Sequence, residues 1–237
     1  MNWDPVTAVL FDLDGVLTPT ADVHMRAWET MFTRVLDQQP TPQEPYTDQD
    51  YFAYIDGKPR YDGVQSFLDA RGIDLPYGQP SDPPELASVC GLGNRKNEIF
   101  NEVLAERGIQ AYPGSLRLLD ALEARGIAMA VVSSSKNAPS VLGAAGIAER
   151  FPVVVDGSVA SRERLPGKPH PDTFLYAASQ LGHEPATSVV VEDAVSGVQA
   201  GAAGGFARVI GVDRGAGRSV LRDAGADEVV SDLADLV

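Results

Sequence analysis

Two aspartates, Asp12 and Asp14, stand where an apolar segment ends, in the stretch "AVLFDLDGV". Burying a carboxylate at the end of a strand is unfavourable unless a cation, a proton or hydrogen-bond donors replace the lost water. A carboxylate can also attack phosphorus and form an aspartyl-phosphate. The pair therefore predicts a site for a metal ion, a phosphoryl group or both at the end of this segment.

Three other apolar segments lead into polar side chains that such a site would use. Ligands of an open parallel sheet bind beyond the carboxyl ends of its strands, so residues at these ends come together. The residues are Ser133, Ser134, Ser135, Lys136 and Asn137 after the segment at 127–133, Lys168 after the segment at 152–155, and Glu192 and Asp193 at the end of the segment at 188–192.

The chemistry of this set is that of phosphoryl transfer. Clustered carboxylates do not all stay ionised without a cation, and ligands that are all oxygen atoms favour a hard ion such as Mg²⁺. Ser133 and the backbone N–H groups after it suit a phosphate oxygen. Lys168 supplies positive charge against the transferring group. We expect Asp12 and Asp14 to flank the metal and the phosphoryl group.

Short valine-rich segments alternate with helical patterns over most of the chain. Continuous apolar runs of this length are typical of strands buried on both faces of a parallel sheet. The predicted fold class is therefore α/β, with a doubly wound, Rossmann-like parallel sheet. The expected strands are 7–12, 127–133, 152–155, 188–192 and 207–212, with a weaker pattern at 227–230, and the expected helices are 115–126, 138–146, 171–182 and 194–205.

Residues 20–107 interrupt this alternation. They contain no valine-rich segment, and loops rich in Pro, Gln and Gly separate their helical patterns. We therefore expect a small helical cap domain, 20–107, inserted into a core domain formed by 1–19 and 108–237. The helical patterns in the insertion are 20–38, 62–72 and 94–108.

Composition restricts the class of partner. The 237 residues include 33 acidic and 19 basic residues, which gives a formal net charge of −14. Such a surface repels polyanions, so we expect no nucleic acid and no membrane as partners. Cys90 is the one cysteine, so no intrachain disulfide is possible. The first residues lack a signal-peptide pattern, and no apolar run reaches the length of a membrane span. We expect a cytoplasmic monomer that binds a small molecule.

Four motifs occur in an order that identifies a family resemblance: "FDLDGV", a serine at the end of the second strand, "GKP" and "VEDAVSG". Together they resemble the motifs of haloacid dehalogenase-type phosphotransferases. The resemblance implies that Asp12 is the nucleophile and Asp14 the general acid and base. It also implies that Ser133 and Lys168 bind the transferring phosphoryl group, with Ser134 as a further candidate for phosphate binding.

The same resemblance implies a metal site. Mg²⁺ would be held by Asp12, the backbone carbonyl of Asp14 and Asp193, with assistance from Glu192. A lone "DLDG" also matches the start of a calcium loop, but the further ligands of that loop are missing from the pattern.

The inserted region resembles that of β-phosphoglucomutases. "DLDGVLTPTADVHMRAW" is similar to the opening of that family, "DGKPRYDG" to its cap segment, "RKN" to its substrate-contacting lysine, and "SSSKN" to its loop for the phosphate that is not transferred. The residues that this resemblance assigns to substrate are Thr20, His24, Trp28, Gly57, Arg60 and Lys96 in the cap, and Ser135, Lys136 and Asn137 in the core.

Simpler interpretations of the cap residues stay open at this point. His24 by default is a surface or hydrogen-bonded histidine, and Trp28 equally fits the apolar core of the cap. Arg60 and Lys96 also fit exposed charges. Three features depart from the pattern of the resembled family and bear on hinge motion and on the identity of the sugar: Pro19 in place of an acidic residue, Gly63 in place of a hydroxyl residue, and a long loop at 75–93.

The function that the resemblance implies is a Mg²⁺-dependent sugar-phosphate mutase, which converts β-glucose 1-phosphate to glucose 6-phosphate through an aspartyl-phosphate. The nearest alternative is a phosphatase of the same superfamily that hydrolyses a small phosphorylated metabolite. A third reading is a binding module that keeps the fold without catalysis. The mutase needs a second cationic site for the spare phosphate of a bisphosphate intermediate, and Arg60 with Lys136 and Asn137 would supply it.

Overall fold

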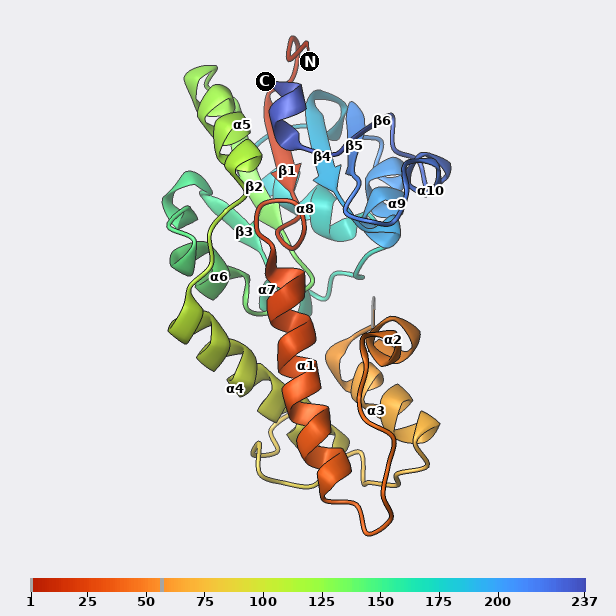
Figure 1. Ribbon diagram of the computed structural model, residues 1–237. Helices are drawn as coiled ribbons and strands as arrows, with labels where there is room; N and C mark the ends of the chain where they lie inside the picture. The colour runs from red at the N-terminus through yellow and green to blue at the C-terminus, as the bar shows by residue number, and fades with distance from the viewer. Residues whose placement is uncertain (1, 56–57) are drawn as a thin grey trace. The chain divides into compact units, whose positions relative to one another are not determined.

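The computed structural model describes residues 2–55 and 58–237, so Gly57 lies outside the described residues. The chain divides into two compact units, each considered by itself. The core unit comprises Met1–Thr20 and Ile109–Val237, and the inserted unit comprises Ala21–Gly108. Figure 1 shows the sheet in the core unit and the helices of the insertion.

The core unit contains a parallel six-stranded sheet with the strand order β3-β2-β1-β4-β5-β6. This is the order of a doubly wound, Rossmann-like sheet, so the predicted fold class is confirmed. The strands are valine-rich because both faces of the sheet are covered; every residue of β1 and β4 is buried. The strands are β1 (Ala8–Phe11), β2 (Ala128–Val132), β3 (Val153–Val155), β4 (Ser188–Glu192), β5 (Arg208–Val212) and β6 (Glu228–Val230).

Helices flank the sheet of the core unit. One face buries Leu10 and Val190 of the central strands against Phe174 of α8 and Val198 of α9. Helix α8 contacts β1, β2 and β3, whereas α9 contacts β4 and β5. The helices are α5 (Pro113–Ala124), α6 (Ala138–Ala144), α7 (Gly157–Glu163), α8 (Asp172–Leu181), α9 (Val195–Ala203) and α10 (Arg218–Asp223), with 3₁₀ turns at Ala148–Arg150, Pro185–Thr187 and Leu233–Leu236.

All the regular secondary structure in the described part of the inserted unit, residues 21–55 and 58–108, is helical, and no strand occurs there. Its aromatic core includes Phe32, which stacks on Trp28 and packs against Phe67. The helices are α1 (Thr20–Asp37), α2 (Asp48–Asp50), α3 (Arg60–Ala70) and α4 (Val89–Arg107), with a π-helical turn at Tyr51–Ile55.

The sequence patterns missed three short helical segments, which are α7, residues 48–55 and α10, and one helix start. Helix α7 has only seven residues and no apolar periodicity, but the Asp156 carboxylate accepts hydrogen bonds from the N–H groups of Ser158 and Val159 and caps it. The helical segment at residues 48–55 likewise begins at an N-cap residue, Thr47. Helix α4 begins at Val89 rather than at 94, because Ser88 caps it by accepting from the Gly91 N–H. None of the described helices is long and apolar enough to cross a membrane.

Candidate active site

The strand ends at the centre of the sheet bring Asp12 and Glu192 together. Phe11, the last residue of β1, is in register with Val131 of β2 and Val191 of β4. Asp12 is therefore level with Glu192, the last residue of β4. The chain order of the strands reverses between β1 and β4, and ligands of doubly wound sheets bind at such a switch point.

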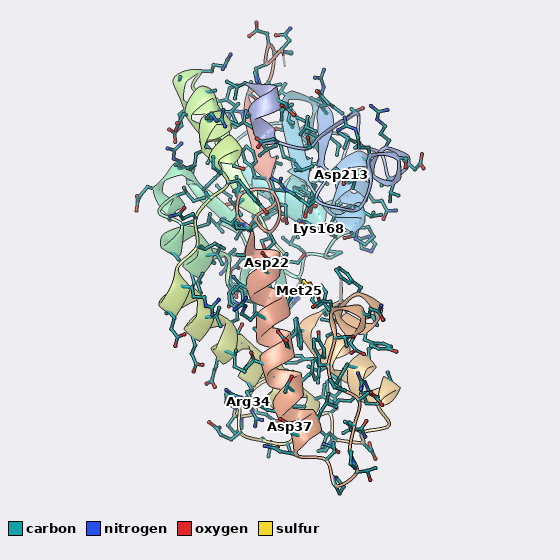
Figure 2. The ribbon with its side chains drawn as sticks, in the orientation of Figure 1. Asp22, Met25, Arg34, Asp37, Lys168 and Asp213 are labelled. Atoms are coloured by element: carbon teal, nitrogen blue, oxygen red, sulfur yellow. The ribbon has the colours of Figure 1, made fainter. Side chains whose placement is uncertain are left out.

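Lys168, which is labelled in Figure 2, links these two carboxylates. Its Nζ donates to Asp12 Oδ1 at 2.5 Å, to Glu192 Oε1 at 2.5 Å and to the Val132 carbonyl at 3.1 Å. The side chains of Lys168 and Glu192 are 7% and 1% exposed, so the contacts are almost free of solvent screening. An ammonium has three N–H donors, and three acceptors receive them here.

Asp193 completes a cluster of carboxylate oxygens. One oxygen from each of Asp12, Glu192 and Asp193 lies within 4.8 Å of the others, a spacing that could hold a metal ion. The Asp14 side chain is outside this group of three and instead accepts a hydrogen bond from the Thr20 hydroxyl.

The cluster holds more negative charge than Lys168 can balance. Burial, together with the charges of Glu192 and Asp14, raises the pKa of Asp193 to about 8. Burial also raises the pKa of Asp12 well above its usual value, although Lys168 opposes the shift. Burial alone would lower the pKa of Lys168, but the Asp12 and Glu192 carboxylates outweigh it and raise that pKa. A divalent cation among these oxygens would relieve the repulsion.

Two glycines let the backbone approach these carboxylates. A Cβ atom at Gly15, whose φ is +80°, would overlap the carboxylate of Asp193. A Cβ at Gly197 in α9 would overlap that of Glu192. The glycines of "DLDG" and "VSG" are therefore required by the packing of the acidic cluster itself.

The loop after β2 carries the serines of the candidate phosphate site. Ser133 is buried, and its hydroxyl accepts from the Ser135 N–H at 3.1 Å. The Ser135 hydroxyl accepts from the Asn137 N–H at 3.1 Å, and Asn137 is also buried. Ser134 and Lys136 are exposed, so their side chains are accessible to a ligand.

In the inserted unit, the structure pairs His24 with Lys96, two residues 72 positions apart. Lys96 is buried, and its Nζ lies 2.6 Å from His24 Nδ1. An ammonium can only donate, so Nδ1 accepts and the neutral imidazole carries its proton on Nε2. The His24 ring stacks on Phe100 with 4.3 Å between ring centroids. Burial lowers the pKa of His24 well below 6.5, and the charges of Lys96 and Arg60 add to the effect.

This pairing predicts a loss of stability in mild acid. The folded pKa of His24 lies below its unfolded value, so below pH 6.5 the unfolded chain binds a proton there that the folded protein does not. The contribution of His24 to the free energy of unfolding is complete above that pH and falls by up to about 1.4 kcal/mol per pH unit below it. Urea unfolding of the wild type and His24→Gln across this range measures it.

The variant should show the shallower decline. His170→Gln is the matched control, because His170 is an exposed histidine of the core unit. Identical pH slopes for the wild type and His24→Gln would contradict the assignment of this loss to His24.

The other candidate residues of the inserted unit have two different environments. Arg60 begins α3, and its Nη2 donates to Asn97 Oδ1 at 2.9 Å. Trp28 is 5% exposed and contributes to the aromatic core, and the Lys96 Nζ lies 5.0 Å from its ring centroid. The structure therefore brings Arg60 to Asn97 and Lys96 to His24, and it makes Trp28 a packing residue that also contacts Lys96.

Relatives of the chain match it over nearly its whole length. The family model of haloacid dehalogenase-like hydrolases matches residues 6–205. The chain is 46% identical to a β-phosphoglucomutase of Mycobacterium bovis, over 99% of this chain and 92% of that protein. The chain belongs to the β-phosphoglucomutase-like family of the haloacid dehalogenase superfamily.

Solved structures of this superfamily share the fold. A β-phosphoglucomutase of Clostridium difficile superposes with a TM-score of 0.77 at 25% identity, covering 98% of this chain and 93% of that one. CbbY of Rhodobacter sphaeroides, in complex with xylulose-1,5-bisphosphate, gives a TM-score of 0.76 at 26% identity, covering 98% and 96%.

The site residues of this haloacid dehalogenase superfamily member fit a hard metal ion. The donors are oxygen atoms, they are clustered, and burial together with the neighbouring carboxylates raises the pKa of Asp193. The motifs did not reveal Asn97, which orients Arg60, although it follows Lys96 directly in "RKN". They also did not reveal Ser115, a buried residue of α5 whose hydroxyl donates to the Val16 carbonyl at 2.7 Å.

Proposed function

We propose that this enzyme is a Mg²⁺-dependent β-phosphoglucomutase that interconverts β-glucose 1-phosphate and glucose 6-phosphate. The observation that carries phosphoryl transfer is the buried Lys168, which contacts Asp12 and Glu192 beside Asp193. The identity of 46% to a β-phosphoglucomutase extends through the inserted unit as well as the core, and this supports the mutase.

In the proposed cycle, Asp12 is the nucleophile. The cycle starts with Asp12 carrying a phosphoryl group as an aspartyl-phosphate. Asp14 removes a proton from a sugar hydroxyl, which attacks phosphorus, so that the new O–P bond forms as the bond from Asp12 to phosphorus breaks and a sugar bisphosphate results. After the bisphosphate turns around, an Asp12 oxygen attacks its other phosphorus, the P–O bond to the sugar breaks, and Asp14 returns the proton to the leaving oxygen. The Thr20 hydroxyl, which donates to the Asp14 carboxylate, holds that carboxylate in place.

Lys168 and a metal ion would balance the negative charge of the transferring phosphoryl group. The Lys168 Nζ lies 2.5 Å from Asp12 Oδ1 and would stay in contact with the phosphoryl oxygens as the bond to Asp12 forms. A bound Mg²⁺, held by Asp12, the Asp14 carbonyl and Asp193 with Glu192 assisting, would neutralise negative charge on the phosphoryl group. Ser133 and Ser134 would donate hydrogen bonds to the remaining phosphoryl oxygens.

The inserted unit would act as a lid with a second phosphate site. A mutase must exclude water from the aspartyl-phosphate and hold the spare phosphate of the bisphosphate intermediate. Arg60, fixed by Asn97, supplies a guanidinium for that phosphate, and Ser135, Lys136 and Asn137 would contribute from the core. His24 and Lys96 would contact the sugar. The alternative, a phosphatase, needs the core residues but not this second site.

Replacing Arg60 by Ala separates the two functions. We expect kcat/KM for β-glucose 1-phosphate isomerisation to fall about 100-fold, because a charge-assisted contact to the spare phosphate is lost. Hydrolysis of a small aryl phosphate, which has no second phosphate, should change by less than about threefold. Parallel steady-state assays on both substrates measure this difference.

Arg107→Ala is the matched control, because Arg107 is an exposed cation of the same unit, in the last turn of α4. It should leave both activities unchanged. Equal losses in the two assays for Arg60→Ala would remove the second phosphate site from the proposal and favour the phosphatase.

A further inference from the structure

The loop that carries Asp14 is held by three donors from other parts of the core unit. The carbonyls of the three consecutive residues after Asp14 each accept a hydrogen bond. The donors are Arg214 Nε to Gly15 at 2.7 Å, the Ser115 hydroxyl to Val16 at 2.7 Å, and the Tyr112 N–H to Leu17 at 2.9 Å.

Arg214 differs from the other two donors in where it originates. Ser115 and Tyr112 belong to the start of α5, whereas Arg214 follows β5. In the sheet, β4 lies between β1 and β5, so the arginine reaches the Gly15 loop across the end of β4, where Asp193 lies. Arg214 therefore connects the segment after β5 to the loop after β1.

The Arg214 side chain is fixed at several points. Its Nη1 donates to the Ser231 carbonyl at 3.1 Å, and its Cζ lies 4.0 Å from the ring centroid of Tyr112. The backbone beside it is also ordered: the side chain of Asp213, marked in Figure 2, accepts from the N–H groups of Gly215 and Gly217 at 3.0 Å each. The guanidinium is therefore positioned before any ligand binds.

Gly15 connects this arginine to the metal ligands. The Gly15 N–H donates to the Thr18 carbonyl at 2.8 Å, which fixes the peptide that contains the Asp14 carbonyl. Arg214 fixes the next peptide through the Gly15 carbonyl. Between the two, Gly15 has a φ of +80° and packs directly against the Asp193 carboxylate. A change in the Gly15 conformation would move the Asp14 carbonyl relative to Asp193.

We propose that Arg214 is a positioning residue that holds Gly15 against Asp193 and thereby sets the geometry of the metal site. This inference rests on the proposed function, because it assumes that the Asp14 carbonyl and Asp193 share a cation. Groups outside the immediate ligands that orient them typically account for about 10- to 100-fold in metal affinity or activity.

The test is the affinity for Mg²⁺ alone, measured by isothermal titration calorimetry on the full chain. Arg214→Ala should weaken Mg²⁺ binding about tenfold. It should also lower kcat for aryl phosphate hydrolysis at limiting Mg²⁺, with KM for the aryl phosphate unchanged and with partial recovery at high Mg²⁺. Arg214→Lys keeps a charged donor and should lie between Arg214→Ala and the wild type.

Arg218→Ala is the control, because Arg218 donates to the Val229 carbonyl in the same corner of the core and does not contact Gly15. Its Mg²⁺ affinity should stay within about twofold of the wild type. If Arg214→Ala does not fold, Tyr112→Leu replaces it: it removes the ring beneath the guanidinium and should weaken Mg²⁺ binding about two- to fivefold.

The outcomes separate this inference from the proposed function. Wild-type protein that binds Mg²⁺ and hydrolyses the aryl phosphate, beside a folded Arg214→Ala variant with unchanged Mg²⁺ affinity, overturns the positioning role alone. Wild-type protein that neither binds Mg²⁺ nor hydrolyses the aryl phosphate overturns both.

Discussion

Replacing Asp12 by Asn should abolish turnover while the protein stays folded. The amide has nearly the shape of the carboxylate, and its oxygen can still accept the hydrogen bond from Lys168. It cannot form the aspartyl-phosphate, and loss of a nucleophile lowers kcat by at least about 10⁴-fold. Both isomerisation and aryl phosphate hydrolysis should disappear together, because both require the aspartyl-phosphate on Asp12.

Asp22→Asn is the matched control for this variant. Asp22, which is labelled in Figure 2, is an exposed aspartate in the first turn of α1, and its substitution makes the same chemical change there. It should leave both activities at wild-type values. A folded Asp12→Asn protein, verified by circular dichroism, that retained substantial turnover would exclude Asp12 as the nucleophile and favour the non-catalytic reading of the fold.

Replacing Lys168 by Met should destabilise the protein and also inactivate it. The change leaves Asp12 and Glu192 buried without their shared cation, and breaking a buried ion pair in this way costs about 3–5 kcal/mol. Urea unfolding in the presence of a chelator measures the loss. Added Mg²⁺ should recover part of the stability, since a cation among the same oxygens opposes the repulsion, but turnover should stay at least about 100-fold below the wild type.

A second variant shows whether the unpaired charge causes the loss. In the double variant Lys168→Met/Glu192→Gln, one of the two carboxylates left without a cation becomes neutral. More than half of the lost free energy of unfolding should therefore return. Lys58→Met, at an exposed lysine that donates to the Ser66 hydroxyl at 2.7 Å, is the control. A Lys168→Met protein whose free energy of unfolding lies within about 1 kcal/mol of the wild-type value would contradict the ion-pair account.

The core of the candidate site could be predicted from the sequence because a simple rule governs it. Valine-rich segments buried on both faces indicate parallel strands, and parallel strands put Asp12, Lys168 and Glu192 at one edge of the sheet. The six predicted strands all occur, each within one or two residues of its expected bounds. The fold class follows from the same patterns.

The remaining features depend on contacts between distant residues. The contacts of His24 with Lys96 and of Arg60 with Asn97 join different helices of the insertion. No local sequence pattern predicts them, because the partners are far apart in the chain. The contact between Arg214 and Gly15 could not be predicted without the strand order, which places β5 one strand away from β1. The short helix α7 is fixed by its Asp156 cap rather than by apolar spacing, so periodicity did not indicate it.

The most direct test of the mutase is the fate of the phosphoryl group. Phosphorus NMR would follow β-glucose 1-phosphate with Mg²⁺ and a trace of glucose 1,6-bisphosphate, so that glucose 6-phosphate and free phosphate are quantified in one sample. We predict that glucose 6-phosphate accumulates with little free phosphate, because the proposed lid would keep water from the proposed aspartyl-phosphate. Free phosphate as the main product would contradict the mutase and identify the enzyme as a phosphatase.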